Sequence, residues 1–130
     1  MPVSFSVSLT LPVSAQRLYD AWLDGETHGL MTGGEAVSRP EEGSVFTAWD
    51  EYISGKHLEL SPHSRIVQSW RSQDFSEEDP DSHLAILFQP TPGGCQLTIN
   101  HSNIPDGQPD YAAGWEEHYF EPMRQFFRTI

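Results

Sequence analysis

The sequence predicts an α+β fold, in which a curved antiparallel sheet of about six or seven strands surrounds one long C-terminal helix. The first ten residues alternate apolar and polar side chains, which is typical of a half-buried strand. Short runs of similar character follow one another at hairpin spacing through the middle of the chain, which favours antiparallel pairing. Residues 109–130 are the longest segment with the apolar spacing of a helix. All 130 residues, positions 1–130, are predicted to form one domain.

The N-terminal part of the chain is predicted to hold one strand followed by two short helices. The strand covers residues 3–10 and ends at Pro12, and Ser14 is a suitable N-cap for a helix over residues 15–23. A second short helix is expected to begin at Asp24 and to be broken by the glycines at positions 29, 33 and 34.

Six further strands are predicted before the long helix, at residues 35–38, 44–49, 52–60, 65–71, 83–89 and 96–102. Asp50 and Glu51 are expected to form a turn, and Gly55 is expected to mark a bulge or bend within its strand. The glycine pair at 93–94 is expected to supply positive φ angles in the last hairpin. The acidic residues 74–82 are expected to form a solvated, mobile loop.

The long helix is predicted over residues 109–130. Its largest apolar side chains recur at steps of three and four, which places them on one stripe: Trp115, Tyr119, Met123, Phe126 and Phe127. Asp106 or Asp110 is expected to cap the first turn, and Pro109 suits a first-turn position. A stripe this aromatic must be buried, so the strands are expected to wrap around it.

Two residues are unusual inside that helix. Gly114 costs about 1 kcal/mol relative to Ala in a helix interior, so it is expected to let another backbone approach closely. Pro122 removes a backbone donor and crowds the carbonyl of His118, so a kink is predicted there. The kink is either an imperfection of a core helix or a feature that shapes one wall of a cavity.

The charge balance limits the partners that the chain is expected to have. The formal net charge is −12, with only seven Lys and Arg residues, which disfavours binding to nucleic acid or anionic membranes. No stretch approaches the roughly 18 apolar residues of a membrane span. The first ten residues lack the basic start of a signal peptide. With one cysteine, Cys95, no internal disulfide is possible, and a cytoplasmic location is expected.

No metal or cofactor site is predicted from the motifs. The six histidines are scattered, and no pair has the spacing and accompanying carboxylates of a zinc site. Cys95 follows a turn without a paired histidine in a recognisable motif. The glycine pairs at 33–34 and 93–94 are interpreted as turn residues and not as a phosphate-binding loop.

Several segments, taken in order, resemble the Aha1-like domain: residues 18–22 (LYDAW), 46–55 (FTAWDEYISG), 58–62 (LELSP), 65–71 (RIVQSWR), 97–101 (LTINH), and Gly114, Trp115, Tyr119 and Pro122. That domain is similar to the C-terminal half of the activator of the Hsp90 ATPase, within the START-like superfamily that includes Bet v 1-type proteins and polyketide cyclases. The resemblance implies a helix-grip fold. The chain departs from the family at Asp50-Glu51, where Asp-Gly is common, and it has no counterpart of the eukaryotic activator's additional N-terminal domain.

A helix laid across a concave sheet tends to leave a cavity that is mostly apolar with a few polar groups. The predicted ligand-binding residues are inward aromatic side chains and two inward polar ones: Trp49, Gln68, Trp70, Phe88, His101, Trp115, Tyr119 and Phe120. Alternatively, the aromatic residues are simply part of the hydrophobic core. A buried polar group without a partner costs about 1–3 kcal/mol, so Gln68 and His101 either bond to the structure or face a cavity.

Three functions are considered, and a non-enzymatic binding domain is the one expected. It would hold a hydrophobic or amphipathic small molecule between the sheet and the C-terminal helix. The first alternative is a protein-interaction domain similar to the Hsp90 activator, with an Hsp90-type chaperone as partner. The second alternative is an enzyme of the cyclase or hydrolase kind, in which His101 acts as acid or base with Tyr119 or Glu117 within reach.

Overall fold

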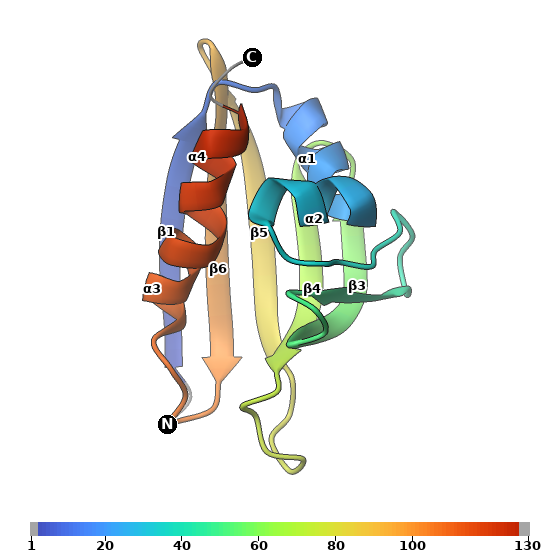
Figure 1. Ribbon diagram of the computed structural model, residues 1–130, viewed down its shortest axis with the longest axis vertical. Coiled ribbons are helices and arrows are strands. Elements are labelled where there is room, and N and C mark those ends of the chain that lie inside the picture. The colour runs from blue at the N-terminus through green and yellow to red at the C-terminus, as the bar shows by residue number, and fades with distance from the viewer. Residues whose placement is uncertain (1–2, 128–130) are drawn as a thin grey trace.

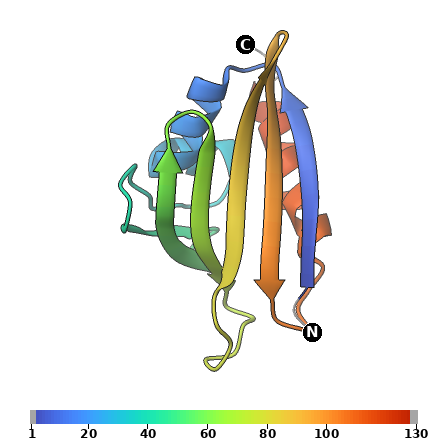
Figure 2. The ribbon, with the colours of Figure 1, turned by 180° about the vertical axis from the view of Figure 1, so that it is seen from behind.

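The computed structural model describes residues 3–127. Six strands form one antiparallel sheet in the order β1-β6-β5-β4-β3-β2 (Figures 1 and 2). Their bounds are β1 Val3–Leu11, β2 Val45–Ala48, β3 Ile53–Ser61, β4 Arg65–Ser72, β5 Ser82–Thr91 and β6 Gly94–Ile104. The predicted weak strand at 35–38 is wrong as a strand, because it contributes only a single bridge between Val37 and Thr47. The α+β class and the antiparallel sheet are confirmed.

Within residues 3–127, all helices lie on one face of the sheet, and no described segment covers the other face (Figures 1 and 2). Strand alternation is confirmed on the covered face: Ile66, Gln68, Trp70, Leu84, Ile86, Phe88, Leu97, Ile99 and His101 are all buried. Side chains of the short helices, including Leu18 and Trp22, complete this core from the other side. The helices and the sheet therefore share one buried layer, and any cavity between them borders it.

The two short helices, α1 Ala15–Leu23 and α2 Gly25–Thr32, start at the predicted caps. Ser14 Oγ accepts from the backbone N–H of Arg17 at 3.1 Å, and Asp24 Oδ2 accepts from that of Thr27 at 3.0 Å. Gly33 ends α2 with a φ of 90°, which favours glycine. Gly29 does not break the helix as predicted; it lies inside α2, where it faces the carbonyl of Gly34 closely.

The C-terminal rod consists of α3 Tyr111–Trp115, the π-helical turn η1 Glu116–Phe120 and α4 Glu121–Phe127. Asp110 is the cap, and its Oδ1 accepts from the N–H of Ala113 at 3.1 Å. Pro109 therefore precedes the cap and does not occupy the first turn. Residues 128–130, part of the predicted helix, lie outside the described residues.

The π-helical turn stands where the kink was predicted, directly before Pro122. Proline cannot donate to the carbonyl of His118 and its ring crowds that carbonyl, so a wider turn relieves the conflict. The extra residue in this turn also rotates the chain so that Trp115, Tyr119 and Phe120 are all buried. The helix is thus interrupted where three aromatic side chains face the sheet.

The roles predicted for Gly55 and Gly114 were both wrong. The irregular pairing of β3 falls between His57 and Glu59, and not at Gly55. A Cβ at Gly55 would lie 1.9 Å from the carbonyl oxygen of Ser69, so glycine permits close strand approach there. Gly114 was expected to admit another backbone, but a Cβ added to it would have no neighbour within 4 Å.

The last hairpin and the acidic loop also differ in detail from the prediction. In the hairpin only Gly93 has positive φ, at 85°; a Cβ at Gly94 would lie 2.0 Å from the carbonyl oxygen of Leu11. The loop at residues 73–81 is anchored, because Arg71 donates to the carbonyl of Ser76 at 2.9 Å and to further acceptors in the loop. The loop therefore has a defined path beside the end of the sheet.

Candidate functional site

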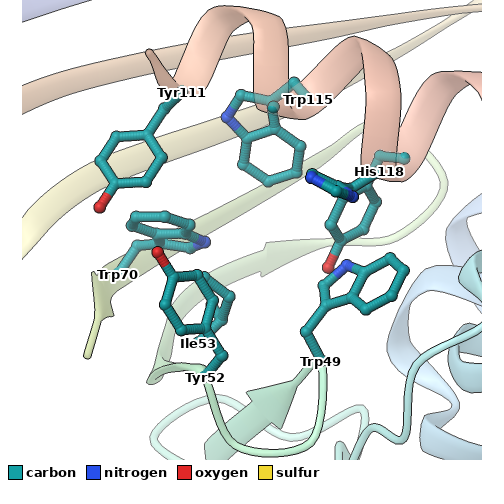
Figure 3. Close-up of a pocket in the computed structure, with 9 residues that line it drawn as sticks. Trp49, Tyr52, Ile53, Trp70, Tyr111, Trp115 and His118 are labelled. Atoms are coloured by element: carbon teal, nitrogen blue, oxygen red, sulfur yellow. The ribbon is translucent and has the colours of Figure 1, made fainter. Parts of the chain in front are cut away.

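An aromatic pocket of about 290 Å³ lies between the C-terminal rod and the ends of strands β2 to β4 (Figure 3). Its walls are formed by Trp49, Tyr52, Ile53, Trp70, Tyr111, Gly114, Trp115, His118 and Tyr119. The volume is close to the lower end of the usual range for small-molecule sites, about 300–1,000 Å³. Gly114 has open space around its α-carbon, so the absent side chain leaves part of this volume free.

Trp49 reaches the pocket from a turn with unusual backbone geometry. Trp49, Asp50 and Glu51 have φ angles of 51°, 56° and 72°, a conformation that non-glycine residues rarely adopt. The turn is held by Asp50, which exchanges two 3.0 Å hydrogen bonds with the backbone of Glu35. A Cβ at Gly34 would lie 2.5 Å from the Trp49 ring, so glycine there makes room for the indole. This region is therefore built to direct Trp49 towards the rod.

The indole N–H of Trp49 has no hydrogen-bond partner among the described residues, although it is shielded from solvent. In Figure 3 the nitrogen lies on the ring edge that faces the helix carrying His118. The His118 ring packs edge-on against this indole, with the two ring centroids 5.5 Å apart. An unpaired buried donor costs about 1–3 kcal/mol. After a small turn of the indole, this donor could reach an acceptor on a bound molecule, which would remove that cost.

Two tyrosines on the pocket wall carry their hydroxyls in a polar network at the rim. Tyr111 donates to Gln108 Oε1 at 2.8 Å and accepts from Ser72 Oγ at 2.6 Å. Tyr52 donates to the carboxylate of Asp74. Burial raises the pKa of Tyr111 to about 12, and burial together with Asp74 raises the pKa of Tyr52. Both rings therefore remain neutral phenols at ordinary pH.

Four of the eight predicted site residues line this pocket: Trp49, Trp70, Trp115 and Tyr119. The other four lie elsewhere in the core. Phe88 packs edge-on against Tyr19, with centroids 5.6 Å apart, and Phe120 is fully buried. Gln68 and His101 belong to separate hydrogen-bond networks. The structure thus brings together four of the six predicted aromatic residues and places both predicted polar residues outside the pocket.

His101 is a buried structural histidine with both ring nitrogens occupied. Its Nδ1 accepts from the indole N–H of Trp115 at 3.2 Å, and its Nε2 donates to Ser82 Oγ at 2.8 Å. Ser82 in turn donates to the carbonyl of Trp70 at 2.7 Å. Burial, with His83 nearby, lowers the pKa of His101 to about 3. The imidazole therefore orients two of the pocket's tryptophans from behind the wall.

Gln68 occupies a similar network with His57. Its side-chain amide donates to Nδ1 of His57 at 3.2 Å, and Nε2 of His57 donates to Ser38 Oγ at 3.0 Å. The His57 ring also stacks on Phe46, with centroids 5.2 Å apart. Burial is the main reason that the pKa of His57 falls to about 4. The amide that was predicted to face a ligand is satisfied by the protein itself.

A third buried histidine, His28 in α2, fixes the pocket residue Tyr119. The Tyr119 hydroxyl donates to Nε2 of His28 at 2.8 Å, and Nδ1 of His28 donates to the carbonyl of Trp22 at 2.8 Å. Burial lowers the pKa of His28 and raises that of Tyr119. This pair could not be predicted from the sequence, since the two residues are 91 positions apart and α2 has no amphipathic pattern.

Five further pocket residues were not predicted from the sequence: Tyr52, Ile53, Tyr111, Gly114 and His118. Two of them had usable signals. Gly114 precedes Trp115 in the helix and so opens space beside it, and Tyr111 lies one turn before Trp115 on the same side of the rod. Tyr52 and Ile53 follow the turn at Trp49, and their position relative to the rod depends on the unusual backbone there.

The described part of the chain has neither a cluster of metal-binding side chains nor a membrane-spanning helix. Between residues 3 and 127 no group of three or more His, Cys, Asp or Glu side chains is arranged to hold a metal ion. Over the same residues no helix has the length and apolar character needed to cross a bilayer.

A curved antiparallel sheet around a C-terminal helix, with an aromatic pocket between them, defines the class of helix-grip proteins. Residues 12–128 match the family described as "Activator of Hsp90 ATPase homolog 1-like protein", and the chain belongs to this family. The resemblance inferred from the sequence is therefore confirmed.

Known relatives agree with this assignment. The chain is 28% identical over 118 residues to the activator of 90 kDa heat shock protein ATPase homolog of Dictyostelium discoideum, and the match covers 88% of this chain. The chain spans only 30% of the length of that relative. PFC0360w, an HSP90 activator from Plasmodium falciparum, superposes with a TM-score of 0.84 at 22% identity, over 95% of this chain and 94% of that one. Protein CV1439 from Chromobacterium violaceum superposes with a TM-score of 0.77 at 22% identity, over 98% of both chains.

Proposed function

We propose that this chain binds a small hydrophobic or amphipathic molecule in the aromatic pocket and does not turn it over chemically. The observation that carries the proposal is the pocket itself, about 290 Å³ in volume and lined almost entirely by aromatic rings. The unpaired indole N–H of Trp49 lies in its wall and would become available to a ligand after a turn of the indole. Small-molecule sites commonly combine apolar walls with a few oriented polar groups. A ligand with an acceptor atom would satisfy the indole while its apolar part contacts the surrounding rings.

The surroundings of the pocket support a binding role. His28, Tyr111 and His101 fix the orientation of neighbouring wall residues through hydrogen bonds, so the walls are held in place before a ligand arrives. Prearranged walls lower the entropy cost of binding. Gly114 leaves space that any larger residue would fill.

The direct test is native mass spectrometry of freshly purified protein, compared with the variants Gly114→Leu and Ala113→Leu. Leucine at 114 fills the pocket, whereas Ala113 is exposed one position away on the same helix and does not line the pocket. We expect a co-purified small molecule in the wild type and in Ala113→Leu, and its loss in Gly114→Leu. A mass that persists in Gly114→Leu would place the ligand elsewhere, and no added mass in any sample would count against the proposal.

Family membership favours a second candidate function, an interaction with an Hsp90-type chaperone. The relatives from Dictyostelium and Plasmodium carry the name of activators of this chaperone. The test is a calorimetric titration of the Hsp90 of the same organism with this chain. Binding at micromolar concentrations supports the interaction, and the absence of heat at tens of micromolar removes it. Such a role, like the single reduced and buried Cys95, suits the predicted cytoplasmic location.

The enzyme alternative has the weakest support. An acid or base must reach the substrate with a free ring nitrogen, whereas both nitrogens of His101 bond to the protein. Of the proposed second groups, Tyr119 already donates its hydroxyl proton to His28. If a ligand is found, we expect its mass to be unchanged after prolonged incubation with the protein. Formation of a product would support the enzyme alternative instead.

A further inference from the structure

The pocket is bordered by aromatic rings that come from several elements and face one space (Figure 3). Trp70 lies edge-on to Tyr111 with centroids 5.1 Å apart, and it is tilted against Trp115 at 6.0 Å. Tyr52 and Trp49 close the opposite side from the turn before β3. A cavity walled by several π-faces attracts cations, because each ring presents negative charge above its face.

The charges around the pocket also favour a cationic ligand over an anionic one. No lysine or arginine of residues 3–127 lines it. Arg71 of β4 lies over the ring of Phe75, which does not line the pocket, at 5.5 Å, and it is paired with Asp81 at 2.7 Å. The carboxylate of Asp74 lies at the rim, where it accepts from Tyr52. An anionic head group would therefore meet no lysine or arginine among the described lining residues, within a chain of net charge −12.

We propose that the ligand is a small organic cation, with a methylated ammonium head between the rings of Trp49, Tyr52, Trp70 and Trp115 and the Asp74 carboxylate nearby. An acceptor oxygen elsewhere in the molecule bonds to the unpaired indole N–H of Trp49. This inference rests on the proposed binding function and adds the charge of the ligand to it. Methylated ammonium groups are weakly hydrated compared with primary amines, so an aromatic enclosure replaces their surroundings at low cost.

The test compares three probes that share a head group with three methyl substituents, by isothermal titration calorimetry on the full chain. The first is acetylcholine, the second is its neutral carbon analogue with a tert-butyl group in place of trimethylammonium, and the third is the anion pivalate. We expect acetylcholine to bind about tenfold more tightly than the neutral analogue, as several rings acting together on one cation would give. Pivalate is expected to show no binding at the same concentrations.

Two matched variants separate the local carboxylate from the overall charge. Asp74→Asn keeps an acceptor for Tyr52 and removes the charge, while Asp20→Asn removes the same charge from an exposed position on α1. We expect Asp74→Asn to weaken acetylcholine binding about threefold and to leave the neutral analogue unaffected. Asp20→Asn should change neither.

The outcomes distinguish this inference from the proposed function. Equal affinity for acetylcholine and the neutral analogue overturns the cation preference and leaves the apolar binding function standing. Tighter binding of pivalate also overturns it. If none of the probes binds, the inference fails, and the native mass spectra of wild type and Gly114→Leu decide the proposed function separately.

Discussion

The indole nitrogen of Trp115 donates to Nδ1 of His101 across 3.2 Å, between the C-terminal rod and strand β6 of the sheet. This hydrogen bond connects the helix to β6 at the back of the aromatic pocket. Because the same imidazole donates from Nε2 to Ser82, its neutral tautomer is fixed by the two partners. The stability of the fold and the shape of the pocket therefore depend on one buried ring.

Replacing the imidazole of His101 should lower the stability of the protein. In His101→Leu the indole N–H of Trp115 stays buried without an acceptor, so we expect the free energy of unfolding to fall by about 1–3 kcal/mol. The measurement is urea denaturation followed by circular dichroism. The control is His83→Leu, an exposed position on the neighbouring strand, which should change stability by less than about 0.5 kcal/mol. Equal effects of the two changes would contradict the role given to His101.

The three buried histidines should make stability depend on pH. Burial lowers the pKa of His28, that of His57 to about 4 and that of His101 to about 3, while an unfolded histidine titrates near 6.5. The unfolded chain therefore binds more protons below pH 6.5. The contribution of these groups is fully present above that pH and is lost as the pH falls towards 4 and then 3.

The expected slope is up to about 1.4 kcal/mol per pH unit for each histidine within that window. Denaturation curves at half-unit steps from pH 7.5 to pH 4.5 measure it. In His57→Asn the slope should decrease, because one of the three titrating rings is removed. Stability that stays constant between pH 6.5 and pH 5 would show that these rings are not buried as neutral groups.

The bond between Tyr119 and His28 can be tested by removing a single oxygen. Tyr119→Phe keeps the ring in the pocket wall and leaves Nε2 of His28 without a donor, so a loss of about 1–3 kcal/mol is expected. Tyr52→Phe, which removes a hydroxyl from the exposed rim, should cost less. Nitrogen-15 spectra of His28 should show the proton on Nδ1 in the wild type. A proton on Nε2 would be incompatible with the hydrogen bond described above.

Two glycine-to-alanine changes should have opposite effects. Gly55→Ala places a Cβ 1.9 Å from the carbonyl oxygen of Ser69, and moving β3 and β4 apart should cost about 3 kcal/mol. Gly114→Ala meets open space, and the better helix propensity should raise stability by up to about 1 kcal/mol. Thermal unfolding of both variants gives the comparison. A destabilised Gly114→Ala protein would mean that the space beside this residue is occupied.

The sequence predicted the elements well wherever one periodic pattern decided the outcome. Alternation along β5 and β6 identified their buried faces. Ser14 and Asp24 were recognised as caps from their side chains, and Asp110 was one of the two candidates for the cap of the rod. The aromatic spacing of the rod correctly predicted burial of Trp115 and Tyr119. These features are local, so a short window of residues contains the information.

What escaped prediction depends on residues that are distant in the sequence. The approach of Gly55 to Ser69 is visible only once β3 and β4 are paired. The π-helical turn combines the constraint of Pro122 with the burial of aromatic side chains on the sheet, and spacing rules assume a regular helix. Gln68 and His101 were recognised as buried polar groups, but their partners, which decide between a structural and a binding role, come from other strands and from the C-terminal rod.

The central claim is that a ligand occupies the aromatic pocket and bonds to the Trp49 indole. The most direct measurement is a heteronuclear NMR titration that follows the four tryptophan indole N–H signals as acetylcholine is added to the full chain. The account predicts a saturable downfield shift of the Trp49 signal, as a hydrogen bond forms, with a smaller change for Trp22, which lies outside the pocket. If the Trp49 signal stays unchanged at acetylcholine concentrations well above the dissociation constant measured by calorimetry, or if Trp22 alone responds, the pocket does not hold the cation in the way described.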